Sequence, residues 1–437
     1  MKRIPKLLSV FMIGLFTVSC SSSKQLNSSN VSSGNAKVIK ISVQAEKDWM
    51  DHYKKAAERV KEKFPNADIK LVELGAFSNL ENIDSTGVSN PDVPDVYTIP
   101  SDRFNTMYKN DSLTPFDAKK IADEIGGWNE FDAGLASSFK VNDEYYAFPM
   151  NIETLITFAN SKNAQNRGID LQGNIEFTEL NYDDMLVALW DLWYGVSFMN
   201  SVNFDLLSKD SQGNLKSDFM KNYTDLTPEQ QDLFKTFFEY WKKHQENKTD
   251  LWDKTATWSY IDDRFVKNSS LRLDGPWSTK SLSELIGSTE ILDVVPINKI
   301  TVNGKELSHW KSGWGLAINP RIEENNEMME VAIEMIKQIV NPDYAIDLFK
   351  STGKILENVS EESYLSSDLS EIDKKVISAV LKSYENSILR PTFEEWSDVW
   401  TAWENGMISW ASVKPASPQE AYETLQASFI AMLKSFK

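Results

Sequence analysis

The pattern of apolar and polar residues near the start of the chain predicts a strand, a helix and a second strand. Residues 38–43 (VIKISV) alternate, as is typical of a strand. From Trp49 to Phe64 apolar positions recur at helical spacing until Pro65, and residues 69–74 again resemble a strand. Such a βαβ unit, within about forty residues, indicates a parallel sheet of the α/β class.

The same patterns continue along the chain. An apolar stripe between Met328 and Ile339 predicts a helix, and Ser417-Pro418 is a typical start for a last helix. Further strands are predicted at 95–99, 145–148, 155–158, 270–273 and 316–318.

The first residues have the pattern of a secretory signal. Basic residues precede an apolar run at 7–18 that is too short to span a bilayer as a permanent helix. The sequence TVSC at 17–20 resembles a bacterial lipobox, although Thr17 replaces the usual leucine. We therefore predict a signal peptide at 1–19 and, at 20–36, a lipidated Cys20 followed by a flexible tether of small polar residues. Cleavage without a lipid is the alternative.

Composition and missing motifs exclude several functions. The chain has 437 residues and a net charge of −18, which disfavours nucleic acid as a partner. Its single cysteine is Cys20, so the folded part has no disulfide and no thiolate metal site. The sequence has no P-loop, dinucleotide-binding glycine motif, zincin motif, EF-hand loop or nucleophile elbow. We therefore expect no cofactor, no metal and no catalytic residue.

Several stretches carry a family pattern. They are VPDVYTIPSDRF at 93–104, YYAFPMNIETL at 145–155, DRFVKNSSLRLDGPW at 263–277, WGLAIN at 314–319 and RPTFEEWSDVW at 390–400. In this order they resemble the extracellular solute-binding proteins of ABC sugar importers, and above all the maltose/maltodextrin-binding proteins. The resemblance implies the type II periplasmic-binding-protein fold, in which two α/β lobes, each a mostly parallel sheet flanked by helices, are joined by a hinge of three chain crossings.

By this resemblance the N-terminal lobe comprises 37–150 and 317–365, and the C-terminal lobe comprises 151–316 and 366–437. It implies a monomeric, non-enzymatic receptor, lipid-anchored to the bacterial membrane and exposed outside the cytoplasm. The receptor would hold a carbohydrate, expected to be an oligosaccharide, between closing lobes and deliver it to the permease of an ABC transporter. Two alternatives stay open: the same fold bound to a polyamine, peptide or metal complex, and a secreted glycoside hydrolase that uses two acids among Glu46, Asp102 and Glu153.

A sugar site needs flat aromatic rings for stacking and planar polar groups for hydroxyls. Residues at or near the positions where the family binds its ligand offer both. They are the polar residues Glu46, Lys47, Asp102, Arg103, Glu153 and Arg390 and the aromatic residues Trp49, Tyr194, Trp277, Trp396 and Trp400. The alternative explanations are a solvated charge pair for Glu46-Lys47 and a structural ion pair for Asp102-Arg103.

The tryptophans near the C-terminus admit two readings. Trp396, Trp400 and Trp403 lie at helical spacing on one face, for which core packing is the usual explanation. The resemblance instead assigns Trp396 and Trp400 to the site and leaves Trp403 in the core. Further walls are expected from residues 190–195 and Phe198.

Three positions depart from the maltodextrin binders. Ile99 stands in place of a stacking tryptophan, Asp274 in place of an asparagine and Arg390 in place of a methionine. An added cation suits an acidic sugar, but Arg390 could equally pair with Glu394, four residues further on. Both explanations stay open.

Overall fold

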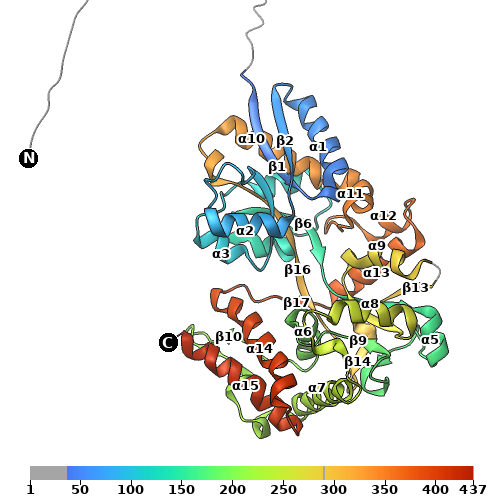
Figure 1. Ribbon diagram of the computed structural model, residues 1–437. Coiled ribbons are helices and arrows are strands. Elements are labelled where there is room, and N and C mark those ends of the chain that lie inside the picture. Colours follow the sequence, from blue (N-terminus) through green and yellow to red (C-terminus); the bar gives the residue numbers. More distant parts are fainter. Residues whose placement is uncertain (1–36, 289–290, 437) are drawn as a thin grey trace, which may run out of the picture. The chain divides into compact units, whose positions relative to one another are not determined.

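The computed structural model describes residues 37–288 and 291–436 (Figure 1). The described residues from Val38 onward form one compact unit. The predicted signal peptide, Cys20 and tether lie outside the described residues. Nowhere in the described part does a helix combine the length and apolarity needed to cross a bilayer.

The predicted βαβ unit is confirmed. Strand β1 (Ile39–Ala45) pairs in parallel with β2 (Ala67–Glu73), and helix α1 (Met50–Lys63) connects them. Tyr53 and Val60, on the apolar face of α1, are fully buried. The helix therefore covers the sheet with the side that its sequence pattern predicts.

Four more strands complete the first sheet, whose order is β17-β16-β3-β1-β2 with β6 also paired to β16. They are β3 (Val96–Pro100), β6 (Ala147–Glu153), β16 (Trp310–Ile318) and β17 (Ile388–Leu389). We call this sheet and its helices the first lobe. The helices are α1, α2 (Ala76–Thr86), α3 (Phe104–Lys109), α4 (Ala118–Ile125), α10 (Asn326–Ile339) and α11 (Ala345–Thr352).

A second sheet has the order β13-β7-β12-β9. Its strands are β7 (Ile156–Asn160), β9 (Met185–Leu186), β12 (Leu271–Asp274) and β13 (Leu292–Pro296). We call this sheet and its helices the second lobe. The helices are α5 (Ser161–Arg167), α6 (Leu192–Ser201), α7 (Pro228–Glu246), α8 (Thr257–Lys267), α9 (Thr279–Ile286), α13 (Glu371–Glu385), α14 (Ser397–Val413) and α15 (Pro418–Ser435).

Short elements fill the connections. Helix α12 (Glu361–Leu365) packs against α13. Strands β8 (Ile175–Glu176), β14 (Ile300–Val302) and β15 (Lys305–Glu306) form a small sheet, and β4 (Lys140–Val141) with β5 (Glu144–Tyr145) and β10 (Ser208–Lys209) with β11 (Leu215–Lys216) form two hairpins.

The two-lobe α/β fold is confirmed, but its strand pairing is more mixed than expected. β1 is parallel to β2 and β3, whereas β16 is antiparallel to β3 and β6, and β7 is antiparallel to β12 and β13. β6 and β7 are successive strands that belong to different sheets, so the chain passes from one sheet to the other there without a crossover helix.

The predicted lobe boundaries remain predictions. The boundary at 150/151 falls inside β6, that at 316/317 falls inside β16, and that at 365/366 falls at the end of α12. Both strands belong to the first sheet along their whole length.

Much of the aromatic content packs the second lobe. The indole N–H of Trp403 donates to the Leu189 carbonyl at 2.9 Å, and that of Trp410 donates to the Ala421 carbonyl at 3.1 Å. Both rings are fully buried. Phe198 is also fully buried in this core, so the expectation that it forms a wall of the site is wrong.

Candidate ligand-binding site

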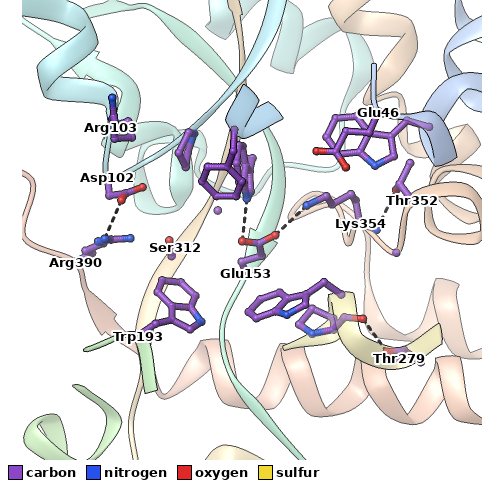
Figure 2. Close-up of a pocket in the computed structure, with 18 of the residues that line it drawn as sticks. Glu46, Asp102, Arg103, Glu153, Trp193, Thr279, Ser312, Thr352, Lys354 and Arg390 are labelled. Atoms are coloured by element: carbon purple, nitrogen blue, oxygen red, sulfur yellow. Dashed lines mark hydrogen bonds and ion pairs between the residues drawn. The ribbon is translucent and has the colours of Figure 1, made fainter. Parts of the chain in front are cut away.

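A cavity of about 1500 Å³ is lined by residues of both lobes (Figure 2). All eleven residues that the sequence assigned to a sugar site line it: Glu46, Lys47, Trp49, Asp102, Arg103, Glu153, Tyr194, Trp277, Arg390, Trp396 and Trp400. The structure thus brings together segments that are far apart in the sequence. Contact of each residue with a ligand remains a prediction.

The first lobe positions its polar residues at the carboxyl ends of two parallel strands. Glu46 directly follows β1, and Asp102 follows β3. Because β1 and β3 run in the same direction, these ends meet at one edge of the sheet, where ligands of open α/β sheets usually bind. Glu46 Oε1 also accepts a hydrogen bond of 3.1 Å from the backbone N–H of Ala76, the first residue of α2. The carboxylate therefore fixes the start of that helix.

Asp102 pairs with Arg390 and not with its neighbour Arg103. Arg390 Nη2 donates to Asp102 Oδ2 at 3.0 Å, while Arg103 pairs with Asp84. The expected pair between Arg390 and Glu394 is also wrong, because residue 390 lies before the helical segment and Glu394 instead pairs with Lys109.

Three indole rings surround the Arg390 guanidinium. Its central carbon lies 5.7 Å from the ring centre of Trp193, 4.7 Å from that of Trp310 and 4.9 Å from that of Trp400. Burial lowers the pKa of Arg390, and the charge of Asp102 acts in the opposite direction. An arginine stays protonated at neutral pH even so, which makes this a buried cation held by aromatic faces and one carboxylate.

Glu153 joins two residues that sequence analysis did not assign to the site. Its Oε2 accepts from Trp314 Nε1 at 2.9 Å, and its Oε1 accepts from Lys354 Nζ at 2.9 Å (Figure 2). The Lys354 ammonium lies 5.6 Å from the Trp49 ring centre and 5.4 Å from that of Trp314. Trp314 belongs to a stretch that carried the family resemblance, whereas no sequence pattern pointed to Lys354.

The second lobe contributes a cluster of tryptophans. Trp193 stacks on Trp400, with ring centres 6.5 Å apart and planes 17° apart, and lies 6.2 Å from Trp277. Trp277 is 44% exposed, which leaves its ring available to a ligand. Sequence analysis had selected Tyr194 from this segment, yet Tyr194 is buried against Trp258 and reaches the cavity only in part.

Of the three positions at which the sequence differs from the maltodextrin binders, two do not line the cavity. Ile99 is fully buried in the first lobe. Asp274 is buried too, where its Oδ2 accepts from Arg272 Nε at 2.9 Å and its Oδ1 accepts from the backbone N–H of Gly275 at 2.8 Å. Burial raises the pKa of Asp274, and Arg272 opposes that shift. Of the three positions, only Arg390 lines the cavity.

Among the residues that the structure describes, no group of three or more His, Cys, Asp or Glu side chains is placed to hold a metal ion. The cavity instead combines indole faces with two ion pairs, Arg390–Asp102 and Lys354–Glu153. Such a surface suits an uncharged ligand with apolar faces and many hydroxyl groups.

The chain has a two-lobe α/β fold of the maltose-binding-protein type, and residues of both lobes line its cavity. No protein-family model matches the chain. The maltodextrin-binding protein MdxE of Bacillus subtilis is 24% identical over 430 residues, which cover 95% of this chain and 94% of MdxE. The resemblance found in the sequence is therefore confirmed by a relative of nearly equal extent.

Solved structures show the same fold. The maltose-binding protein MalE of Listeria monocytogenes, in complex with maltose, has a TM-score of 0.67 and 20% identity over 91% of this chain and 98% of its own. MalX of Streptococcus pneumoniae, in complex with maltopentaose, has a TM-score of 0.67 and 17% identity over 91% of this chain and 100% of its own. A cyclo/maltodextrin-binding protein complexed with maltotetraose has a TM-score of 0.68 and 16% identity over 92% of this chain and 98% of its own.

Proposed function

We propose that this protein is the carbohydrate receptor of an ABC importer and binds a neutral oligosaccharide of the maltodextrin class between its lobes. The observation that carries the proposal is the cavity itself, in which an exposed Trp277 and the Trp193–Trp400 stack accompany carboxylates on the opposite lobe. Flat rings complement the apolar faces of a pyranose, and carboxylates accept hydrogen bonds from its hydroxyls. MdxE and the three solved relatives are named for, or hold, ligands of this class.

A neutral sugar fits better than an acidic one. Three buried or half-buried cations line the wall, and each already has a carboxylate partner: Arg390 with Asp102, Lys354 with Glu153 and Arg103 with Asp84. An acidic sugar would have to displace one of these carboxylates or add a second negative charge beside it, which costs electrostatic energy in a poorly solvated site. A hydroxyl can bond to either partner without breaking the pair.

The receptor would act by lobe closure and without catalysis. A ligand held by both lobes stabilises the closed form, and the permease would recognise that form. We also propose that the protein is a monomer, anchored by a lipid on Cys20 and exposed outside the cytoplasm. Cys20→Ser should then release it from the membrane fraction, and retention would mean that the anchor is not a lipid.

The test uses the body from Lys37 onward, in which the residues from Val38 form a compact unit. It is titrated with neutral maltodextrins, uronic-acid oligosaccharides, polyamines, peptides and metal complexes, while intrinsic tryptophan fluorescence and melting temperature are followed. A ligand that binds the native state raises the melting temperature. We expect neutral maltodextrins to do so. If no sugar shifts either signal but another class does, the carbohydrate proposal is wrong, and sugar released over time would indicate a hydrolase.

A further inference from the structure

Phe77 is an exposed aromatic ring in the wall of the cavity. Its side chain is 67% exposed, although it lines the same cavity as Trp277 and Trp193. It lies in the first turn of α2, a helix of the first lobe. A large apolar ring left exposed in a concave wall indicates a binding surface more than core packing.

The ring is held in place from two sides. The hydrogen bond from Ala76 N–H to Glu46 fixes the turn that carries Phe77. The ring itself contacts Trp314 in an edge-to-face arrangement, with ring centres 5.2 Å apart and planes at 80°. Trp314 is in turn fixed by its hydrogen bond to Glu153. Support of this kind reduces the entropy lost when a ligand binds.

An edge-to-face contact leaves stacking surface free. Whichever ring supplies the edge, at least one face of Phe77 is not covered by Trp314. The other aromatic residues with which the first lobe lines the cavity are buried, at 4% exposed for Trp49, 7% for Trp314 and 5% for Phe349. Among the aromatic rings with which the first lobe lines the cavity, Phe77 is therefore the one whose face is open to a ligand.

Position 99 supplies no ring to the first lobe. The family resemblance implied a stacking ring there, but Ile99 is fully buried and does not line the cavity. The second lobe presents the exposed Trp277. Without Phe77, one lobe would hold an oligosaccharide by stacking while the other offered mainly polar groups.

We propose that Phe77 is the sugar-stacking platform of the first lobe and takes the apolar face of one pyranose ring of the ligand. This inference rests on the proposed function, because it requires that the ligand is an oligosaccharide. Phe77 would then determine the affinity and the chain-length preference for the ligand. It is not among the residues that the family resemblance assigned to the site.

The experiment compares Phe77→Ala, Phe77→Leu and Phe77→Tyr with the wild-type body by calorimetric titration with maltose, maltotriose and maltotetraose. We expect Phe77→Ala to lower affinity by about 10-fold for at least one of these sugars. Phe77→Tyr keeps the flat ring and should stay within about 3-fold of wild type, while Phe77→Leu keeps apolar volume without a flat face and should behave like Phe77→Ala. Leu389→Ala is the matched control, since Leu389 is 68% exposed and does not line the cavity.

Each possible result of this experiment either supports or overturns the inference. If the wild type binds these sugars and Phe77→Ala binds them equally well, the inference is wrong while the proposed function stands. If Phe77→Leu binds like the wild type, stacking is wrong, because a plain apolar contact suffices. If the wild type binds no sugar, the proposed function fails and the inference falls with it. Because Phe77 is mostly exposed, its variants should melt within about 2 °C of wild type.

Discussion

Arg390 Nη2 donates to Asp102 Oδ2 at 3.0 Å and joins two residues that are 288 positions apart in the sequence. Asp102 follows β3 of the first lobe, and Arg390 precedes α14 of the second. The Arg390 side chain is 4% exposed, compared with 26% for Asp102. The cation therefore depends more on its partner than the carboxylate does, because the carboxylate keeps contact with water.

The two single variants of this pair should differ in stability. Asp102→Ala leaves a buried guanidinium without its carboxylate and should lower the free energy of unfolding by about 3 kcal/mol. Arg390→Met leaves a carboxylate that water can still reach and should cost about 1–2 kcal/mol. The double variant should lose less than the sum of the two. Urea unfolding of the four proteins, treated as a double-mutant cycle, measures the difference.

Arg103 supplies the matched control for this cycle. It pairs with Asp84, and the two side chains are 38% and 45% exposed. Arg103→Met should therefore change stability by less than about 1 kcal/mol. Strictly additive losses for Arg390 and Asp102 would mean that their ion pair contributes no coupling energy.

Trp277 and Trp403 should respond oppositely to truncation. Trp277 is 44% exposed in the cavity wall, so Trp277→Ala should weaken sugar binding by about 1–3 kcal/mol and leave the fold intact. Trp403 is fully buried in the second lobe, so Trp403→Ala should lower stability by about 3–5 kcal/mol. Calorimetric titration and urea unfolding of both variants separate the two effects. Unchanged affinity in folded Trp277→Ala would remove Trp277 from the site.

Gly275 offers a way to move Trp277 without removing it. A Cβ atom at Gly275 would lie 2.1 Å from the Trp277 ring, so Gly275→Ala must displace the indole. The backbone at Gly275, with φ −111° and ψ 173°, accepts alanine without strain. We expect Gly275→Ala to lower sugar affinity in the wild type but to have no further effect in a Trp277→Ala background. An equal loss in both backgrounds would show that Gly275 acts by another route.

The sequence predicted the fold and much of the cavity because both depend on local pattern or ordered motifs. The alternation at 38–43 and the helical spacing up to Phe64 follow from burial on one face, which the structure shows in β1 and α1. Trp396, Trp400 and Trp403 show what sequence spacing alone cannot predict, namely which tryptophans are buried in the core and which line the cavity. Trp400 and Trp403 lie in α14, whereas Trp396 ends the short 3-10 helix before it. Trp403 is fully buried in the core, while Trp396 and Trp400 line the cavity.

Ion partners could not be predicted in this way. The partner of Arg390 is Asp102, 288 positions away, and the partner of Glu153 is Lys354, 201 positions away. Only the assembled fold brings such pairs together. Proximity in sequence pointed to Arg103 and Glu394 instead, and both of these residues pair elsewhere.

The pH dependence of stability should report on the buried His244. Its Nε2 lies 3.0 Å from the Tyr182 carbonyl and its Nδ1 lies 2.8 Å from the Thr249 hydroxyl, inside the second lobe. Burial lowers the pKa of His244 from 6.5 to about 4, and the hydrogen bond to Tyr182 acts in the opposite direction. The unfolded chain therefore binds a proton at His244 between pH 6.5 and pH 4 that the native protein does not bind.

It follows that the native state keeps its full His244-linked stability above pH 6.5 and loses it as the pH falls toward about 4. One proton corresponds to a slope of up to about 1.4 kcal/mol per pH unit. His244→Gln lacks this proton, so its free energy of unfolding should depend less steeply on pH across this window, even if it is lower at pH 7. Buried carboxyls with raised pKa values, such as Asp274, act with the opposite sign in both proteins and cancel in the comparison. Parallel curves from urea unfolding at a series of pH values would mean that His244 takes up its proton equally well in the native and the unfolded states.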